Sequence, residues 1–182
     1  MFKGNRFPSG SRSQVSIEEL RDSLWTSIDP AAYEGSGEKY QVSLMEQYKI
    51  YVEMTDRVSA RRSLNNTFFL VVNAGIIAGF GPIASYLERG GVVVLIPLVM
   101  LIFQCAVWYF TLRSYRQLGS VKYRVIGVLE ERLPASPYWS AEWKAVGQGK
   151  RQGLYLPITR LEQVTPAIFG IAYLVVLLLV AT

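Results

Sequence analysis

Two long apolar runs, separated by only four residues, constrain the fold of this chain more than any other feature. They are FFLVVNAGIIAGFGPIASYL and VVVLIPLVMLIFQCAVWYFTL, and they occupy residues 68–112 on either side of Glu88-Arg89-Gly90-Gly91. Each run has about 20 residues and no charged side chain, which is enough at ~1.5 Å per residue to cross a hydrocarbon core about 30 Å thick. Because backbone in lipid must satisfy its own hydrogen bonds, we expect a hairpin of two transmembrane helices.

A third apolar run, PAIFGIAYLVVLLLVAT, covers residues 166–182. It is short but uncharged, so we predict a third transmembrane helix over residues 164–182, with a re-entrant or interfacial segment as the alternative. The expected fold class is therefore an all-α integral membrane protein with three transmembrane helices.

The segments that flank the hairpin have the pattern of amphipathic helices. Residues 40–67 contain no Pro or Gly, and their apolar side chains recur every three or four residues. This helix is expected to continue into the first apolar run as one rod, or to kink at Asn65-Asn66. Residues 113–133 keep helical spacing after the second run, within a helical region that spans residues 113–163. We expect the two helices to pack as an antiparallel cytoplasmic stalk.

The N-terminal region, residues 1–39, is expected to contain a disordered basic tail, a short helix and a linker. Ser16 and Glu19 have the spacing of a capping box, which predicts a helix from Ile17 to about Ile28. We expect this helix to dock on the rest of the protein, or alternatively to lie on the membrane surface.

After Pro134 the sequence predicts a turn and a short helix capped by Ser140. The aromatic residues Tyr138, Trp139 and Trp143 in this segment suit either a cytoplasmic core or the headgroup region of the membrane.

The distribution of basic residues predicts the orientation. Nine Lys and Arg precede residue 68, one lies in the four-residue turn, nine lie in 113–160, and none follow. The positive-inside rule therefore places the N-terminus and residues 113–163 in the cytoplasm and the C-terminus outside.

Composition disfavours several function classes. The chain has no His and a single Cys, Cys105, which leaves no pattern for a zinc site or a disulfide and no histidine for acid–base catalysis. No nucleophile–base or carboxylate pair stands at catalytic spacing, so we expect no enzyme, metal site or cofactor. The net charge of +5 comes from bases near the ends of apolar runs, so nucleic acid is not an expected partner. Cys105 is expected to be a small apolar filler.

Within the apolar runs, small and polar residues are the candidates for function. Ala74, Gly75, Ala78 and Gly79 form an overlapping small-xxx-small pattern that suits close helix packing, either between copies of the chain or against the second run. Asn73 and Gln104 are the strongly polar side chains of the two runs. Each is expected to hydrogen-bond across helices or to line a polar path in a ring of copies.

Arginine residues also gather where the stalk meets the hairpin. They are expected to form a basic belt against anionic headgroups, with Asp56 or Glu53 as alternative partners across the stalk. The belt consists of Arg57, Arg61, Arg62, Arg113 and Arg116.

Seven short segments give the sequence a resemblance to small bacterial integral membrane proteins. They are Glu46-Gln-Tyr-Lys49, Tyr51-Val-Glu-Met54, Asp56-Arg57, Ser59-Ala-Arg-Arg62, Asn66-Thr-Phe-Phe69, Arg113-Ser-Tyr-Arg-Gln-Leu118 and Leu133-Pro-Ala-Ser-Pro-Tyr138. In layout the chain also resembles SLATT-type proteins, which are proposed to act as pore-forming effectors in antiphage and nucleotide-signalling systems.

That resemblance implies an oligomeric effector or sensor in the bacterial inner membrane that responds to a cytosolic protein partner. A passive anchor or scaffold for such a partner is the alternative.

Overall fold

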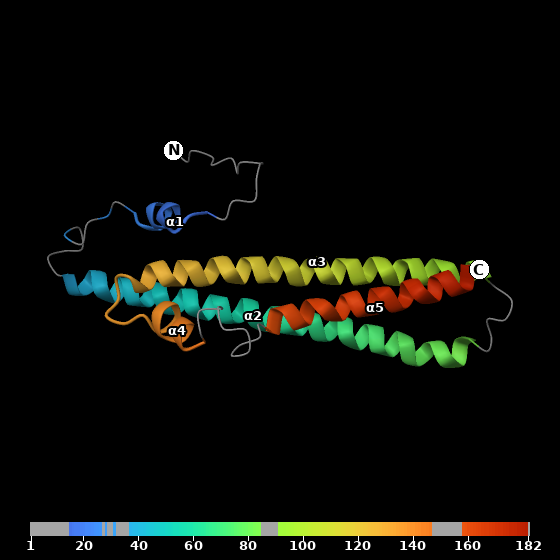
Figure 1. Ribbon diagram of the computed structural model, residues 1–182. Coiled ribbons are helices and arrows are strands. Elements are labelled where there is room, and N and C mark those ends of the chain that lie inside the picture. The colour runs from blue at the N-terminus through green and yellow to red at the C-terminus, as the bar shows by residue number, and fades with distance from the viewer. Residues whose placement is uncertain are drawn as a thin grey trace, which may run out of the picture.

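The computed structural model describes residues 15–26, 28, 31, 37–84, 91–146 and 158–181. These residues form an elongated bundle of helices, and no strand occurs among them (Figure 1). The helices are α1 Ile17–Leu24, α2 Gly37–Ala84, α3 Gly91–Glu130, the π-helix η2 Pro137–Glu142, α4 Trp143–Ala145 and α5 Ile158–Ala181.

Helices α2 and α3 are two antiparallel rods that run almost the full length of the bundle (Figure 1). α2 has 48 residues and α3 has 40, and each joins a polar half to an apolar half without interruption. The polar half of α2 therefore continues into the first apolar run as one helix, with no break at Asn65-Asn66. The pairs Tyr48–Glu130 and Asn73–Cys105 lie at opposite ends of the contact and fix its antiparallel register.

Helix α5 lies along the apolar half of α3 and runs antiparallel to it (Figure 1). Their shared core contains Leu98, Leu101, Cys105 and Tyr173, all at most 7% exposed. Cys105 is 3% exposed, as expected of an apolar filler. It lies beside Gly170 of α5, where an added Cβ atom would make ordinary van der Waals contact with the Cys105 Cβ at 3.6 Å.

Two of the described helices contain a stretch long and apolar enough to cross a membrane. These stretches are Leu95–Glu130 in α3 and Leu161–Val180 in α5. The first predicted run forms the apolar half of α2, but its side chains from residue 80 onward lie outside the described residues, as does the predicted turn at Glu88-Arg89-Gly90.

Helix α5 begins at Ile158, ahead of the predicted boundary at residue 164, and Pro166 lies inside it. A proline ring normally disfavours the preceding helical turn. Here that turn is fixed by tertiary contacts, because Glu162 pairs with Arg62 and Gln163 accepts a hydrogen bond from Arg116. The prediction began the helix at residue 164 because the sequence pattern could not include these contacts.

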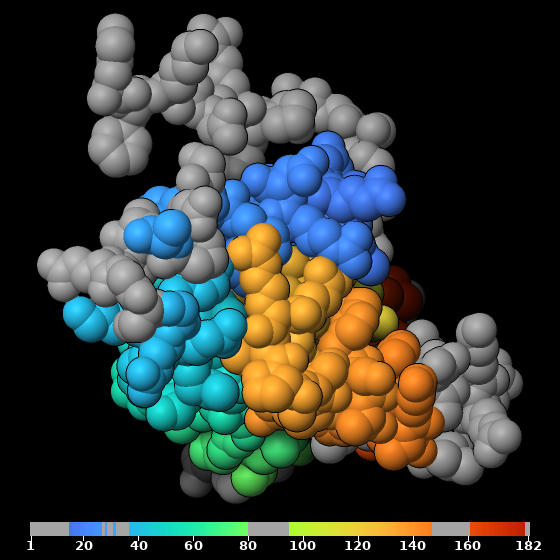
Figure 2. All heavy atoms as spheres, turned by 90° about the vertical axis from the view of Figure 1, so that its left-hand side faces the viewer, coloured from blue at the N-terminus to red at the C-terminus, as the bar shows by residue number. Residues whose placement is uncertain are grey.

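Helix α1 has the predicted capping box but ends at Leu24, four residues before the predicted end. The Ser16 hydroxyl accepts from the Glu19 amide, and the Glu19 carboxylate accepts from the Ser16 amide. The helix ends where Trp25 adopts an extended backbone and its ring stacks on the Arg132 guanidinium, 3.6 Å from the ring centroid. α1 docks on α3, as predicted, and Figure 2 shows it against the end of the stalk.

Candidate functional site

The carboxyl group of Glu130 is buried at the stalk end of the bundle. Glu130 is the last residue of α3 and is 2% exposed. Its Oε1 accepts from the Tyr48 hydroxyl at 3.0 Å and from the Tyr138 amide at 3.1 Å. Its Oε2 accepts from the Ser136 hydroxyl at 2.6 Å and the Trp139 amide at 3.0 Å. One side chain thereby joins α2, α3 and η2, and we call these five residues the Glu130 clamp.

The backbone after α3 explains how the clamp forms. Ser136 precedes Pro137, and the first turn of η2 presents its free amide groups to the carboxyl group, as the unpaired amides at a helix start allow. The sequence predicted a helix capped by Ser140. Instead Ser140 lies within η2, whose N-cap residue, Ser136, uses its hydroxyl on Glu130.

The phenol of Tyr48 is held in its neutral form by this environment. Burial raises the pKa of Tyr48, and the hydrogen bond to Glu130 raises the pKa further, because both disfavour a phenolate. Tyr48 therefore remains a hydrogen-bond donor to the carboxyl group through the physiological pH range.

The aromatic residues after Pro134 lie at the surface of the stalk, where they are partly exposed and one of them contacts α3. Trp139 packs on Gly127 of α3 so closely that a Cβ atom there would lie 2.6 Å from Trp139 Cδ2. Tyr138, Trp139 and Trp143 are between 37% and 49% exposed.

A second polar cluster lies deep in the apolar half of the bundle, around Asn73. This side chain is fully buried, at 0% exposure. Its Oδ1 accepts from the Tyr173 hydroxyl at 2.9 Å and is 3.8 Å from the Cys105 Sγ, while its Nδ2 donates to the Phe69 carbonyl at 2.8 Å. Asn73 therefore forms the interhelical hydrogen bond that was one of its two predicted roles, and it lies inside a single copy of the chain.

Gln104 occupies a different position. It is half-buried and lines a shallow groove on the side of α3 next to Ile76 of α2. None of the hydrogen bonds between described residues involves its amide group. The structure therefore separates two residues that the sequence treated as a pair: Asn73 is satisfied within the protomer, and Gln104 is not.

The small-residue pattern of the first run faces away from α3 and α5. Ala74, Gly75 and Ala78 are exposed and Gly79 is half-buried. A Cβ atom added at Gly75 or Gly79 would meet nothing within 4 Å. Within one protomer these residues do not bring α2 close to α3, which was one of the two predicted arrangements.

Three of the arginine residues of the predicted belt have described partners. Arg57 pairs with Glu53 at 2.6 Å, Arg62 lies 3.2 Å from Glu162, and Arg116 donates to Gln163 at 3.1 Å. The alternative prediction, a pair between Asp56 or Glu53 and Arg113 or Arg116, is replaced by these contacts.

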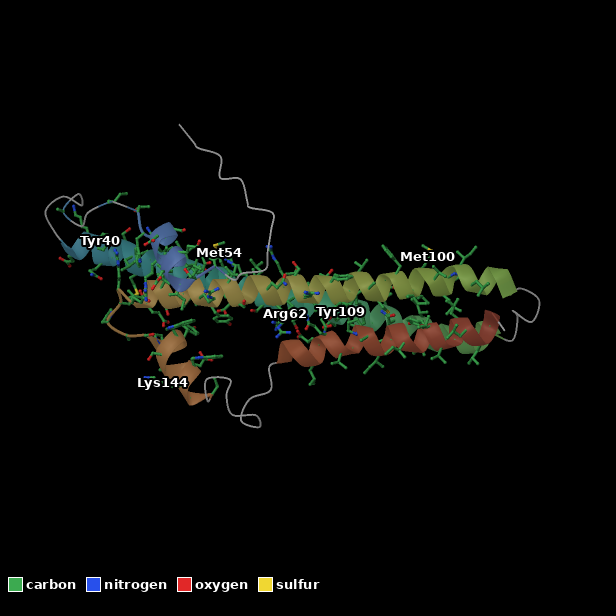
Figure 3. All side chains as sticks on the ribbon, turned by 45° about the horizontal axis from the view of Figure 1, so that its top comes forward. Tyr40, Met54, Arg62, Met100, Tyr109 and Lys144 are labelled. Atoms are coloured by element: carbon green, nitrogen blue, oxygen red, sulfur yellow. The ribbon has the colours of Figure 1, made fainter. Side chains whose placement is uncertain are left out.

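Figure 3 shows Arg62 at the level where α5 joins the bundle. Two arginines from different helices thus hold the start of α5. Arg61 is exposed and Arg113 is half-buried.

Sequence reasoning missed Glu130, Tyr173 and Glu162 as organising residues. Glu130 is followed by Glu131 and Arg132 and so has the local pattern of a solvated helix end. The available signal was indirect, because Tyr48, Ser136 and Tyr138 all lie in the short segments that gave the chain its resemblance. The contacts of Glu130, Tyr173 and Glu162 each join different helices of the same copy.

Comparison with known proteins gives one match. The sequence model of the octameric membrane protein family (8xMP) matches residues 45–182, which include most of α2 and all of α3, η2, α4 and α5. No curated protein and no solved structure matches the chain. The matched region contains the Glu130 clamp, the Asn73 cluster and the outward-facing small residues.

Proposed function

The chain belongs to the octameric membrane protein family, a family of oligomeric membrane proteins, and from this premise we propose that it forms a homo-octameric scaffold in a bacterial inner membrane. In the proposed arrangement each copy contributes three transmembrane helices and one cytoplasmic stalk. The N-terminus is cytoplasmic and the C-terminus is outside, in accord with the positive-inside rule.

The observation that carries this proposal is the outward-facing surface of α2. Ala74, Gly75 and Ala78 are exposed in a helix whose opposite face packs against α3. In lipid, small residues favour association because they let helix backbones approach closely. Because no other helix of the same copy covers this face of α2, the face is suited to contact with another copy.

Long continuous helices suit the scaffold role. Helices α2 and α3 each continue from the apolar half of the copy into the polar half without a break. The Glu130 clamp joins the two helices at the end of the polar half. Eight copies would present eight such stalks on one side of the membrane. We propose that the stalks bind a cytosolic protein partner and that the assembly acts without enzymatic chemistry.

A pore-forming effector is the competing function, and the contacts of the polar residues favour the scaffold. A water-filled path needs polar side chains on a surface shared by copies. Asn73 is fully buried between the helices of one copy, so of the two predicted lining residues only Gln104 reaches the outer surface.

Copy number and membrane leakage distinguish these functions. Native mass spectrometry of the protein in lipid nanodiscs should give eight copies, and Gly75→Leu together with Gly79→Leu should reduce that number. Liposomes that contain the octamer should retain an entrapped dye. A monomer would contradict the assembly, and dye release that depends on Gln104 would replace the scaffold by a pore.

Topology is tested separately by cysteine labelling in spheroplasts. In a Cys105→Ala background, a cysteine placed at Gly90 should react with a membrane-impermeant reagent and one at Gly149 should not. Labelling at position 149 without permeabilisation would contradict the proposed orientation.

A further inference from the structure

An apolar groove on the outer side of α3 has one polar residue on its wall. The groove has a volume of about 560 Å³ and is lined by Ile76 of α2 and by Pro97, Met100, Phe103, Gln104 and Val107 of α3, among others. Figure 3 shows Met100 on the face of α3 that points away from the other helices. Phe103 and Met100 are 70% and 67% exposed, so the groove has prominent side chains at its edge and no cover from its own copy.

The amide group of Gln104 indicates what kind of cover the groove requires. In the three-span arrangement proposed above, Gln104 lies at the depth of Asn73, because its neighbour Cys105 contacts Asn73. A polar group at this depth has no water to bond, and lipid tails offer neither a donor nor an acceptor. Since no described residue of the same copy binds the Gln104 amide, the groove is suited to a polar partner from outside the copy.

The symmetry of a membrane oligomer limits which surface can provide that partner. All copies have the same orientation across the membrane, so the symmetry axis of a closed octamer must be perpendicular to the membrane plane. A ring of more than two copies then uses two different surfaces of each copy, one for each neighbour. Because all copies also lie at the same depth, surfaces that touch must match in depth.

The outer face of α2 satisfies both conditions. Ala74 and Ala78 lie at the depth of Gln104 and Met100, as the contact between Asn73 and Cys105 fixes the register of the two helices. Both alanines are exposed. Their small side chains leave backbone carbonyl oxygens accessible, and each carbonyl has a second lone pair in addition to the one used within the helix.

We infer that the groove beside Gln104 seats the outer face of α2 of the neighbouring copy, with the Gln104 amide donating to a backbone carbonyl group near that copy's small residues. This inference rests on the proposed octamer and adds the location and the polarity of its interface. Bulky side chains at Met100 and Phe103 then lie against the small residues, which is a complementary fit of sizes.

Two other occupants are conceivable for this groove. One is the outer face of α5 of a neighbour, whose exposed residues Ile168, Ile171 and Leu178 are bulky and apolar. The other is a lipid chain. A lipid chain offers no polar group, and the exposed alanines of α5, Ala167 and Ala172, are five residues apart and so do not share a face. The outer face of α2, with small residues one turn apart, is therefore the better match for Gln104.

Disulfide cross-linking in membranes tests the inference directly. In a Cys105→Ala background, the pairs Ala74→Cys with Phe103→Cys and Ala78→Cys with Met100→Cys should each give a ladder of cross-linked species up to the octamer. Within one copy these positions face away from each other, so a bond must form between copies, and it requires Cα atoms about 4.4–6.8 Å apart. Each single cysteine variant should give no ladder, because the two surfaces differ.

Two controls make the result specific. The pair Ala78→Cys with Val107→Cys places the cysteines at different depths and should give no ladder. The pair Ile171→Cys with Phe103→Cys reports the α5 alternative, and a ladder there without one from the α2 pairs would overturn the inference. Octamers seen by native mass spectrometry in the absence of any ladder would also overturn it while leaving the proposed octamer intact. Loss of the octamer itself would remove both.

The hydrogen bond has its own test in Gln104→Leu. An interhelical hydrogen bond in a membrane contributes about 1 kcal/mol, so this substitution should weaken each interface about fivefold. Gln117→Leu on the exposed polar half of α3 is the matched control and should leave assembly unchanged. Equal octamer populations for Gln104→Leu and the parent protein, across a dilution series in detergent, would contradict the role of the amide.

Discussion

The hydroxyl group of Tyr173 on α5 donates a hydrogen bond of 2.9 Å to Asn73 on α2, across 100 positions of the sequence. This contact lies inside the apolar half of the bundle, where Cys105 of α3 is the second neighbour of the same Asn73 oxygen. It links the first and third apolar runs through side chains, although α3 provides most of the backbone packing around α5.

Tyr173→Phe should destabilise the protein by about 1 kcal/mol, because the buried Asn73 Oδ1 loses the hydroxyl group that donates to it while the packing of the ring is retained. Thermal unfolding in detergent measures the change. Tyr109→Phe, at an exposed position of α3, is the matched control and should change the unfolding temperature little. Equal effects of the two substitutions would show that the interhelical hydrogen bond contributes nothing to stability.

Glu130→Gln should destabilise the stalk more than the same substitution of an exposed glutamate does. The glutamine amide nitrogen replaces either Oε1 or Oε2, and each of these oxygens accepts one backbone N–H, from Tyr138 or from Trp139. Whichever way the amide is turned, one buried N–H loses its acceptor, which costs about 1–3 kcal/mol.

Hydrogen exchange at residues 136–142 should report this loss as faster exchange. Glu142→Gln is the control, because Glu142 lies in the same π-helix and is exposed. Unchanged exchange in Glu130→Gln would mean that the clamp does not hold η2 in place.

Two glycines of α3 should respond oppositely to alanine. At Gly127 a Cβ atom would lie 2.6 Å from Trp139 Cδ2, so Gly127→Ala must displace the indole ring and destabilise the protein. At Gly119 nothing lies within 4 Å, so Gly119→Ala should stabilise the helix by about 0.5–1 kcal/mol through its backbone propensity. Unfolding temperatures of the two variants should fall on opposite sides of the parent value, and a shift in the same direction would contradict the packing of Trp139 on α3.

Docking of α1 should weaken in acid. The hydrogen bonds from Arg21, at 2.7 and 2.8 Å, lower the pKa of Glu131 below its ordinary value. A lowered pKa in the docked state stabilises docking at pH values above the ordinary pKa, and this contribution is lost as the pH falls through the lowered value. Exchange of the α1 amides, corrected for intrinsic rates, should therefore increase below about pH 4.

The variant Glu131→Gln lacks the charged partner of Arg21 at every pH. The α1 amides of this variant should therefore exchange fast at all pH values, without the pH dependence of the parent protein. Asp22→Asn, on the exposed side of the same helix, should retain it. If the parent protein and Glu131→Gln exchange at the same rate at neutral pH, the Arg21–Glu131 pair does not dock α1.

Several features of the fold were predictable because they depend on local rules. Lipid thickness and the need of backbone groups for internal hydrogen bonds determine that a long uncharged run is helical, and α3 and α5 confirm this for two runs. The capping box at Ser16 is equally local, since its partners are three residues apart. The association of copies, one of the two roles predicted for the small residues, agrees with the family match.

Helix ends and polar partners depended on distant contacts. α5 starts ahead of Pro166 because Arg62 and Arg116, about 100 and 47 residues away, hold its first turns. α1 ends at Leu24 because Trp25 stacks on Arg132. A helical period of 3.6 residues tells which side chains share a face, but it does not tell which residue of another helix lies opposite.

The sequence by itself therefore determined the helices, their apolar lengths and the set of polar residues within them, because each depends on neighbours along the chain. Only the tertiary structure decided that Asn73 is enclosed, that Gln104 is exposed to a groove, and that Glu130 joins three helices. The physical reason is that a buried polar group is stabilised by the particular donor or acceptor opposite it, and that partner is fixed by the register between helices.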